Sequence, residues 1–157
     1  PRAGLYGYYD ASFADDADTR RSTMAYIFFF EGCPISWKSK LHSYVTTSTN
    51  HSEYCASAKA AREAKSQKKL LTEIGFEKFA SPVALFSDSQ GAIAMNYNPV
   101  KRDASKHIDL ADHYAREQVE LGTISITHVS TKMMIADILT KALLRALFDS
   151  FVPFLVR

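Results

Sequence analysis

The chain has 157 residues, 46% of them hydrophobic and 23% charged, which is the composition of an ordinary globular protein with enough residues to bury a core. No apolar run approaches ~20 residues and the N-terminal stretch is polar and aromatic, so we expect neither a membrane span nor a secretory signal peptide. The net charge of +2 excludes little, whereas Cys33 and Cys55 are too few and too far apart for a disulfide framework or a cysteine-ligated zinc site.

The first part of the chain predicts three β-strands. Residues 5–13 (LYGYYDASF) are aromatic and partly alternating, and residues 24–32 (MAYIFFFEG) form a second such run after the polar turn ADDADTRRST. Residues 35–41 (ISWKSKL) alternate after Pro34. Because short connections join these strands, we expect an antiparallel meander.

A long helix is predicted next, ending near Gly75. The stretch is rich in Ala, Glu, Lys and Leu, has few β-branched residues, and repeats its apolar residues at roughly helical intervals. Thr49 or Asn50 is the expected N-cap, Glu53 falls in the first turn, and Gly75 is the expected C-cap.

Strands and helices alternate in the middle of the chain. VALFS (83–87) predicts a strand, and a short helix over 89–97 follows it. Pro99 ends that helix because the residue before a proline disfavours helical backbone. A further helix is predicted over 105–121.

The last predicted elements are a strand, TISITHV (123–129), and one amphipathic helix, TKMMIADILTKALLRALFDSF (131–151). The buried stripe of this helix is predicted to contain Met134, Ile138, Leu139 and Leu143. Three antiparallel strands followed by alternating helices and strands predict a mixed sheet with helices packed on it, in a single domain over residues 1–157.

Four carboxylates stand in or beside predicted core elements: Asp10, Glu53, Asp88 and Asp137. An acid in an apolar segment is costly unless something compensates it. A helix cap or a salt bridge explains any one of them, but four together suggest a divalent metal site, because hard cations prefer carboxylate oxygens. Four acids can hold two ions ~3.5–4 Å apart, one to activate a water and one to stabilise the departing oxygen of a phosphodiester.

Other site chemistries find little support. The chain has no GxxxxGK[ST], GxGxxG, GxSxG or HExxH pattern. Two stretches are basic, AKAAREAKSQKKL (58–70) and VKRDASKH (100–107). From charge alone, a solvated helix face is the favoured interpretation, and phosphate binding is the alternative.

In its order of elements and acids the chain resembles ribonuclease H. Its local sequences resemble more specifically the ribonuclease H domain of copia-type LTR retrotransposon Pol polyproteins. The matching segments span nearly the whole chain: GYYDASFADDADTRRSTMAYIFF, PISWKSKL, TSTNHSEYCA, LFSDSQGAIAMNYNPV, SKHIDLADHYAREQVELGTI and VSTKMMIADILTKALL. The resemblance implies an α/β, ribonuclease H-like fold with a five-stranded mixed sheet, three antiparallel strands and then two parallel ones, and helices on both faces.

The resemblance also implies roles for single residues. The implied catalytic, metal-binding acids are Asp10, Glu53, Asp88 and Asp137. The cofactor would be Mg²⁺, two ions with substrate, for which Mn²⁺ substitutes. The implied substrate-binding residues are Ser12, Asn50, Ser89, Gln90 and Lys106. The chain departs from the family where Phe13 replaces a usual tryptophan, and in VSTKMM, which lacks the loop histidine of many cellular ribonucleases H.

The implied function is that of an endonuclease that hydrolyses the RNA strand of RNA–DNA hybrids during reverse transcription of a retroelement. The implied partners are nucleic acid and a reverse transcriptase domain in the parent polyprotein, without a membrane. The implied location is the cytoplasm, with a virus-like particle or the nucleus as alternatives. Two other hypotheses stay open: a non-catalytic, domesticated RNA- or hybrid-binding module, and a nuclease-superfamily activity on DNA such as strand transfer.

Overall fold

The computed structural model describes residues 3–76, 82–98 and 113–156. Within these ranges the strands are β1 (Leu5–Ser12), β2 (Thr23–Phe30), β3 (Cys33–Leu41), β4 (Val83–Ser87) and β5 (Ile124–His128). The α-helices are α1 (Thr49–Glu73), α2 (Gln90–Tyr97), α3 (Tyr114–Glu120) and α4 (Arg145–Leu155). Two 3-10 helices precede α4, namely η4 (Thr131–Met133) and η5 (Ile135–Leu139).

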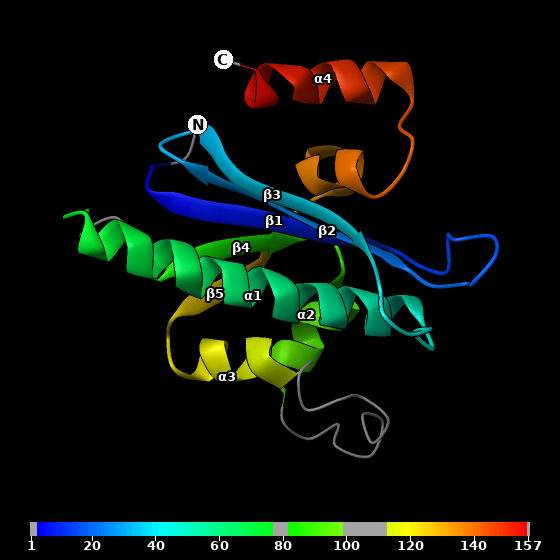
Figure 1. The fold of residues 1–157 in the computed structure, drawn as a ribbon, viewed down its shortest axis with the longest axis horizontal. Coiled ribbons are helices and arrows are strands. Elements are labelled where there is room, and N and C mark those ends of the chain that lie inside the picture. The colour runs from blue at the N-terminus through cyan, green and yellow to red at the C-terminus, as the bar shows by residue number, and fades with distance from the viewer. Residues whose placement is uncertain (1–2, 77–81, 99–112, 157) are drawn as a thin grey trace.

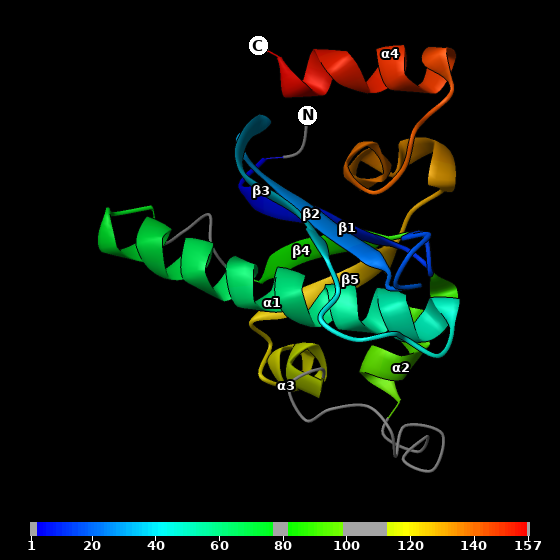
Figure 2. The ribbon, with the colours of Figure 1, turned by 45° about the vertical axis from the view of Figure 1, so that its right-hand side comes forward.

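The five strands form one mixed sheet in the order β3-β2-β1-β4-β5. β2 pairs antiparallel with both β3 and β1, whereas β4 pairs parallel with β1 and β5. Figures 1 and 2 show helices on both sides of this sheet: α1, α2 and α3 cover one face, and the 3-10 helices and α4 lie on the other. The predicted fold class is therefore confirmed, including the three antiparallel and two parallel strands.

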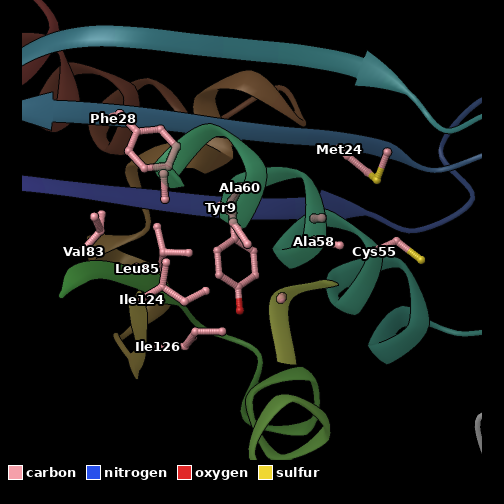
Figure 3. Close-up of a cluster of buried hydrophobic side chains, with 14 of the residues drawn as sticks. Tyr9, Met24, Phe28, Cys55, Ala58, Ala60, Val83, Leu85, Ile124 and Ile126 are labelled. Atoms are coloured by element: carbon pink, nitrogen blue, oxygen red, sulfur yellow. The ribbon is translucent and has the colours of Figure 1, made fainter. Parts of the chain in front are cut away.

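The main core lies between α1 and the sheet (Figure 3). Tyr9, Phe28 and Leu85 project from three adjacent strands and are fully buried. The helix meets them with alanines, including Ala58 and Ala60, and these small side chains let a long helix lie close to the strands. Gly7 of β1 leaves space for the Phe28 ring of β2, because a Cβ atom there would stand 2.7 Å from that ring.

The ends of α1 are defined by hydrogen bonds. Ser48, rather than the expected Thr49 or Asn50, is the N-cap, and its side chain accepts a hydrogen bond from the His51 N–H. At the other end Gly75 has φ +90° and follows the cap residue. Its N–H bonds to the Thr72 carbonyl and the next N–H bonds to the Leu71 carbonyl, which is the Schellman arrangement that glycine favours.

The predicted continuous helix over 131–151 is wrong. The chain forms η4 and η5, then extended backbone at Leu144, where ψ is 141°, and only then α4. Four consecutive residues, 134–137, are all buried, and the first three of them join an apolar cluster with Ile27 and Phe29 of β2. Of the predicted stripe, Met134 is fully buried but Ile138, Leu139 and Leu143 are only half-buried. Burial of 134–137 against the sheet therefore overrides the helical pattern.

The helix predicted over 105–121 is described only as α3, and residues 105–112 lie outside the described residues. In the part of the chain that the structure describes, no helix is both long and apolar enough to cross a membrane.

Candidate active site

Three of the predicted acids meet at one edge of the sheet. Tyr8 of β1 is level with Phe86 of β4 in the parallel pair, so Asp10 and Asp88, each two residues further on, emerge side by side. The first turns of α1 add Glu53. One carboxylate oxygen from each of these acids lies within 4.8 Å of the others. The structure thus brings together residues that are separated by 43 and 35 positions in the sequence.

The electrostatics of this group are unfavourable without a cation. Asp10 and Glu53 are buried, and Asp88 is half-buried. Burial raises the pKa of Glu53 to about 10, and the charges of Asp10 and Asp88 act in the same direction. Burial, followed by the charge of Glu53, also raises the pKa of the Tyr9 hydroxyl. The site therefore favours a protonated Glu53 when nothing else neutralises it.

The residues fit a divalent cation. Glu53 Oε2 is buried and has no hydrogen-bond partner among the described residues, so its carboxylate keeps an unused acceptor oxygen at the three-acid group. The group contains oxygen donors alone, without cysteine or histidine, which is the donor set that Mg²⁺ and Mn²⁺ prefer. Burial is the main cause of the raised pKa of Glu53, and an ion of this kind would offset both this burial cost and the repulsion from Asp10 and Asp88.

Asp137, the fourth predicted acid, has a different environment. It is buried in η5, and its Oδ1 lies 3.0 Å from the Lys141 ammonium. The same ammonium lies 3.7 Å from Asp10 Oδ2, so a lysine joins Asp137 to the other acids. The three-acid group that is close enough to share one ion does not include Asp137.

Burial and neighbouring charges shift the pKa values of both Asp137 and Lys141. Burial raises the pKa of Asp137, the charge of Asp10 raises it further, and Lys141 opposes both. For Lys141 itself, burial disfavours the ammonium form, but the charges of Asp10 and Asp137 outweigh that effect and raise its pKa. The ammonium is therefore firmly protonated and is the cation that compensates Asp137.

Two threonines orient the acids. The Thr140 hydroxyl donates a hydrogen bond to Asp10 Oδ2, and both groups are buried. The Thr131 hydroxyl donates to Asp88 Oδ2 over 2.8 Å, which ties η4 to the end of β4. Sequence reasoning missed Thr131, Thr140 and Lys141. Only Lys141 left a signal, because it follows Asp137 by four residues, the spacing of a helical ion pair.

The predicted substrate-binding residues fall in several places. Ser89 caps α2, and its hydroxyl lies 3.5 Å from Asn50 Oδ1, so the N-terminal ends of α1 and α2 adjoin one another. Gln90 is exposed in the first turn of α2, and Ser12 is half-buried at the end of β1. Lys106 lies outside the described residues.

No family model matches the chain. Two curated proteins are similar to it: the retrovirus-related Pol polyprotein from transposon RE2 of Arabidopsis thaliana, 39% identical over 147 residues, and that from transposon TNT 1-94 of Nicotiana tabacum, 37% identical over 145 residues. The alignments cover 94% and 92% of this chain but 10% and 11% of the relatives. The chain thus spans about one tenth of the length of these relatives.

Solved structures with the same fold are ribonucleases H. RNase H1 from the halophilic archaeon Halobacterium salinarum NRC-1 has a TM-score of 0.56 at 16% identity, over 93% of this chain and 98% of that one. LC11-RNase H1, solved in complex with RNA/DNA hybrid, has a TM-score of 0.55 at 16% identity, over 87% of this chain and 93% of that one. The resemblance predicted from the sequence is confirmed: the chain has the ribonuclease H-like fold, and its homologues are retrovirus-related Pol polyproteins from copia-type transposons.

Proposed function

We propose that the chain is a divalent-metal-dependent ribonuclease H that hydrolyses the RNA strand of RNA–DNA hybrids. The observation that carries this proposal is the group formed by Asp10, Glu53 and Asp88, which lies at a sheet edge of a ribonuclease H-like fold. Support also comes from the Pol polyprotein homologues and from a structural neighbour that was solved with RNA/DNA hybrid.

Asp10, Glu53 and Asp88 are the residues that would hold a first Mg²⁺ ion, and Asp10 with Asp137 a second one. When bound, such ions lower the pKa of water and stabilise negative charge on phosphate oxygens. The protein's own groups prepare for this. Glu53 has to lose its proton before it can bind a cation, so ion binding releases a proton. Thr131 and Thr140 hold the carboxylates of Asp88 and Asp10 in fixed orientations.

Lys141 would leave its position between Asp10 and Asp137 if a second ion bound there. Its side chain is 41% exposed, so the ammonium can reach solvent by rotation of a flexible stem. In that position it would meet the phosphate of a bound substrate. Lys141 is therefore proposed to hold the fourth acid in place before substrate arrives.

Recognition of the RNA strand is proposed to involve the adjoining ends of α1 and α2. Asn50, Ser89 and Gln90 offer neutral hydrogen-bonding groups next to the acids. A 2′-hydroxyl is both donor and acceptor, so amide and hydroxyl side chains can recognise it. Ser12 and Lys106 remain proposed contacts from the family resemblance alone.

The test is cleavage of a labelled RNA–DNA hybrid by the purified chain, with Mg²⁺ and with chelator. Cleavage is expected with the ion only, and Asp88→Asn is expected to slow it by more than about 100-fold, because a ligand is lost. Asp149→Asn removes one exposed carboxylate from α4 that belongs neither to the three-acid group nor to the Asp137–Lys141 pair, and serves as the matched control. A thermal melt of each variant establishes that it is folded.

The same assay separates the other hypotheses. A chain that binds the hybrid but does not cleave it with Mg²⁺ or Mn²⁺ would contradict the enzymatic proposal and support a binding module. Cleavage or strand transfer on duplex DNA, with the hybrid left intact, would support the DNA-directed activity. An Asp88→Asn variant as fast as the wild-type chain would contradict the role of Asp88.

A further inference from the structure

A groove separate from the acids lies between the edge strand β3 and α1. It has a volume of about 290 Å³, and its floor is formed by Met24, Ala25 and Ala56, which are buried. Its walls carry the positively charged side chains of Lys38, Lys40, Lys59 and Arg62, together with one acid, Glu63. Two cations come from the strand and two from the helix, so the groove is positive on both sides.

The orientation of β3 explains why its lysines face the helix. Ser36 donates a hydrogen bond to Glu63 of α1, whereas Ser39 donates one to the Leu139 carbonyl on the opposite face of the sheet. Because side chains alternate along a strand, residues 38 and 40 project to the same face as Ser36. Lysines are common on edge strands as a protection against pairing. Here they also converge with cations from a second element, which edge protection does not require.

The one acid of the groove is already engaged. Glu63 accepts hydrogen bonds from the Ser36 hydroxyl at 2.6 Å, the Gln67 amide at 2.7 Å and the Tyr26 hydroxyl at 3.2 Å. These neutral donors occupy both carboxylate oxygens. Further along α1, Lys69 lies 3.8 Å from Glu73 and is not part of the groove. The basic stretch 58–70 is thus not a uniform solvated face, because Lys59 and Arg62 line a concave site.

The groove begins beside the acids. Ala25 of its floor is the β2 partner of Asp10, and Ala56 is one helical turn after Glu53. Lys59 stands six residues after Glu53, which is about 9 Å along the helix axis, and Arg62 stands about 13 Å away. A nucleic-acid strand rises ~3.4 Å per nucleotide, so these cations lie roughly three to four nucleotides from the acids.

We propose that this groove binds the phosphodiester backbone of the nucleic acid whose RNA strand is cleaved at the acids. The proposal rests on the function proposed above. The cations would neutralise successive backbone phosphates without reading the base sequence, since phosphate contacts position a strand and carry no sequence information. The groove is then a second contact that fixes the direction in which the hybrid crosses the protein.

The test measures the salt dependence of hybrid binding. Lys38→Gln combined with Lys59→Gln removes one cation from each wall, and Lys69→Gln combined with Arg145→Gln removes two exposed cations elsewhere as the matched control. Binding is followed by fluorescence anisotropy in the Asp88→Asn background with Mg²⁺, so that the hybrid stays intact. Each phosphate contact contributes about 0.9 to the slope of log Kd against log salt concentration. The groove variant should therefore lose between one and two units of slope, and on the order of tenfold in affinity per contact at 0.1 M salt.

The loss of slope in the groove variant should come from the removed charges rather than from a change in the shape of the groove. Lys38→Arg combined with Lys59→Arg keeps both charges and should bind with the wild-type slope. If the groove variant is folded by its thermal melt and keeps the slope of the control, the proposal is wrong. Polyglutamate is an anionic polymer without a phosphodiester backbone and serves as a second probe. The proposal is equally wrong if the groove variant loses affinity for polyglutamate but binds the hybrid like the wild-type chain. Absence of cleavage by the wild-type chain would overturn the proposed function, whereas the slopes test the groove in either case.

Discussion

The Lys141 ammonium provides the sharpest test of how the acids are compensated before any ion binds. It lies 3.0 Å from Asp137 Oδ1 and 3.7 Å from Asp10 Oδ2, and these two acids are 1% and 2% exposed. Lys141→Met removes the charge and keeps most of the aliphatic stem, so the loss of packing is small. The change leaves two buried carboxylates without this cation.

The expected loss of stability follows from burial. Removing one partner of a fully buried ion pair costs about 3–5 kcal/mol, whereas exposed pairs are worth about 0–1 kcal/mol. Because the Lys141 side chain is 41% exposed and its partners are buried, we expect an intermediate loss of about 1–3 kcal/mol. For a chain of this length that corresponds to a decrease in Tm of about 2–12 °C.

The assay is thermal unfolding at pH 8, in chelator and in millimolar Mg²⁺. In chelator Lys141→Met should melt below the wild-type chain. In Mg²⁺ the difference should shrink, because a bound divalent cation replaces the charge that the lysine supplied. Lys69→Met, which alters an ion pair whose lysine is 77% exposed, should melt within about 1 °C of wild type. A Lys141→Met chain that melts like the wild type in chelator would refute this reasoning. So would a Mg²⁺-induced increase in Tm that is equal in the variant and in the wild-type chain.

Two further changes test the buried acid and the core. The folded-state pKa of Glu53 is raised from its ordinary value of 4.5 to about 10, so the stability it confers is complete below pH 4.5 and is lost as the pH rises toward 10. In chelator the wild-type Tm should therefore fall between pH 5 and pH 9, and Glu53→Gln should flatten this decline; an unchanged slope would contradict the raised pKa. Gly7→Ala places a Cβ atom 2.7 Å from the Phe28 ring, and such overpacking costs about 1–3 kcal/mol. Its urea midpoint should fall accordingly, and an unchanged midpoint would mean that Phe28 moves freely.

Local patterns predicted most of the fold because the relevant forces are local. The partly alternating residues 5–13 and the apolar run 83–87 predicted strands that β1 and β4 confirm, and the alanine-rich stretch before Gly75 predicted α1. The prediction was wrong at residues 131–144, where an amphipathic pattern suited a helix. There two 3-10 helices pack Met134, Ile135 and Ala136 against the sheet, and this tertiary packing outweighs helical propensity.

The amino-acid sequence already contains the functional groups of the site: four carboxylates in or beside core elements, with no cysteine or histidine pattern that would hold zinc. How these carboxylates are grouped depends on the packing of the strands and helices. The parallel register of β1 and β4 places Asp10 beside Asp88, and α1 adds Glu53, whereas Asp137 is joined to them through Lys141. The basic groove likewise exists because β3 and α1 pack side by side. Distances between residues far apart in the chain depend on register and on helix packing, which no local pattern encodes.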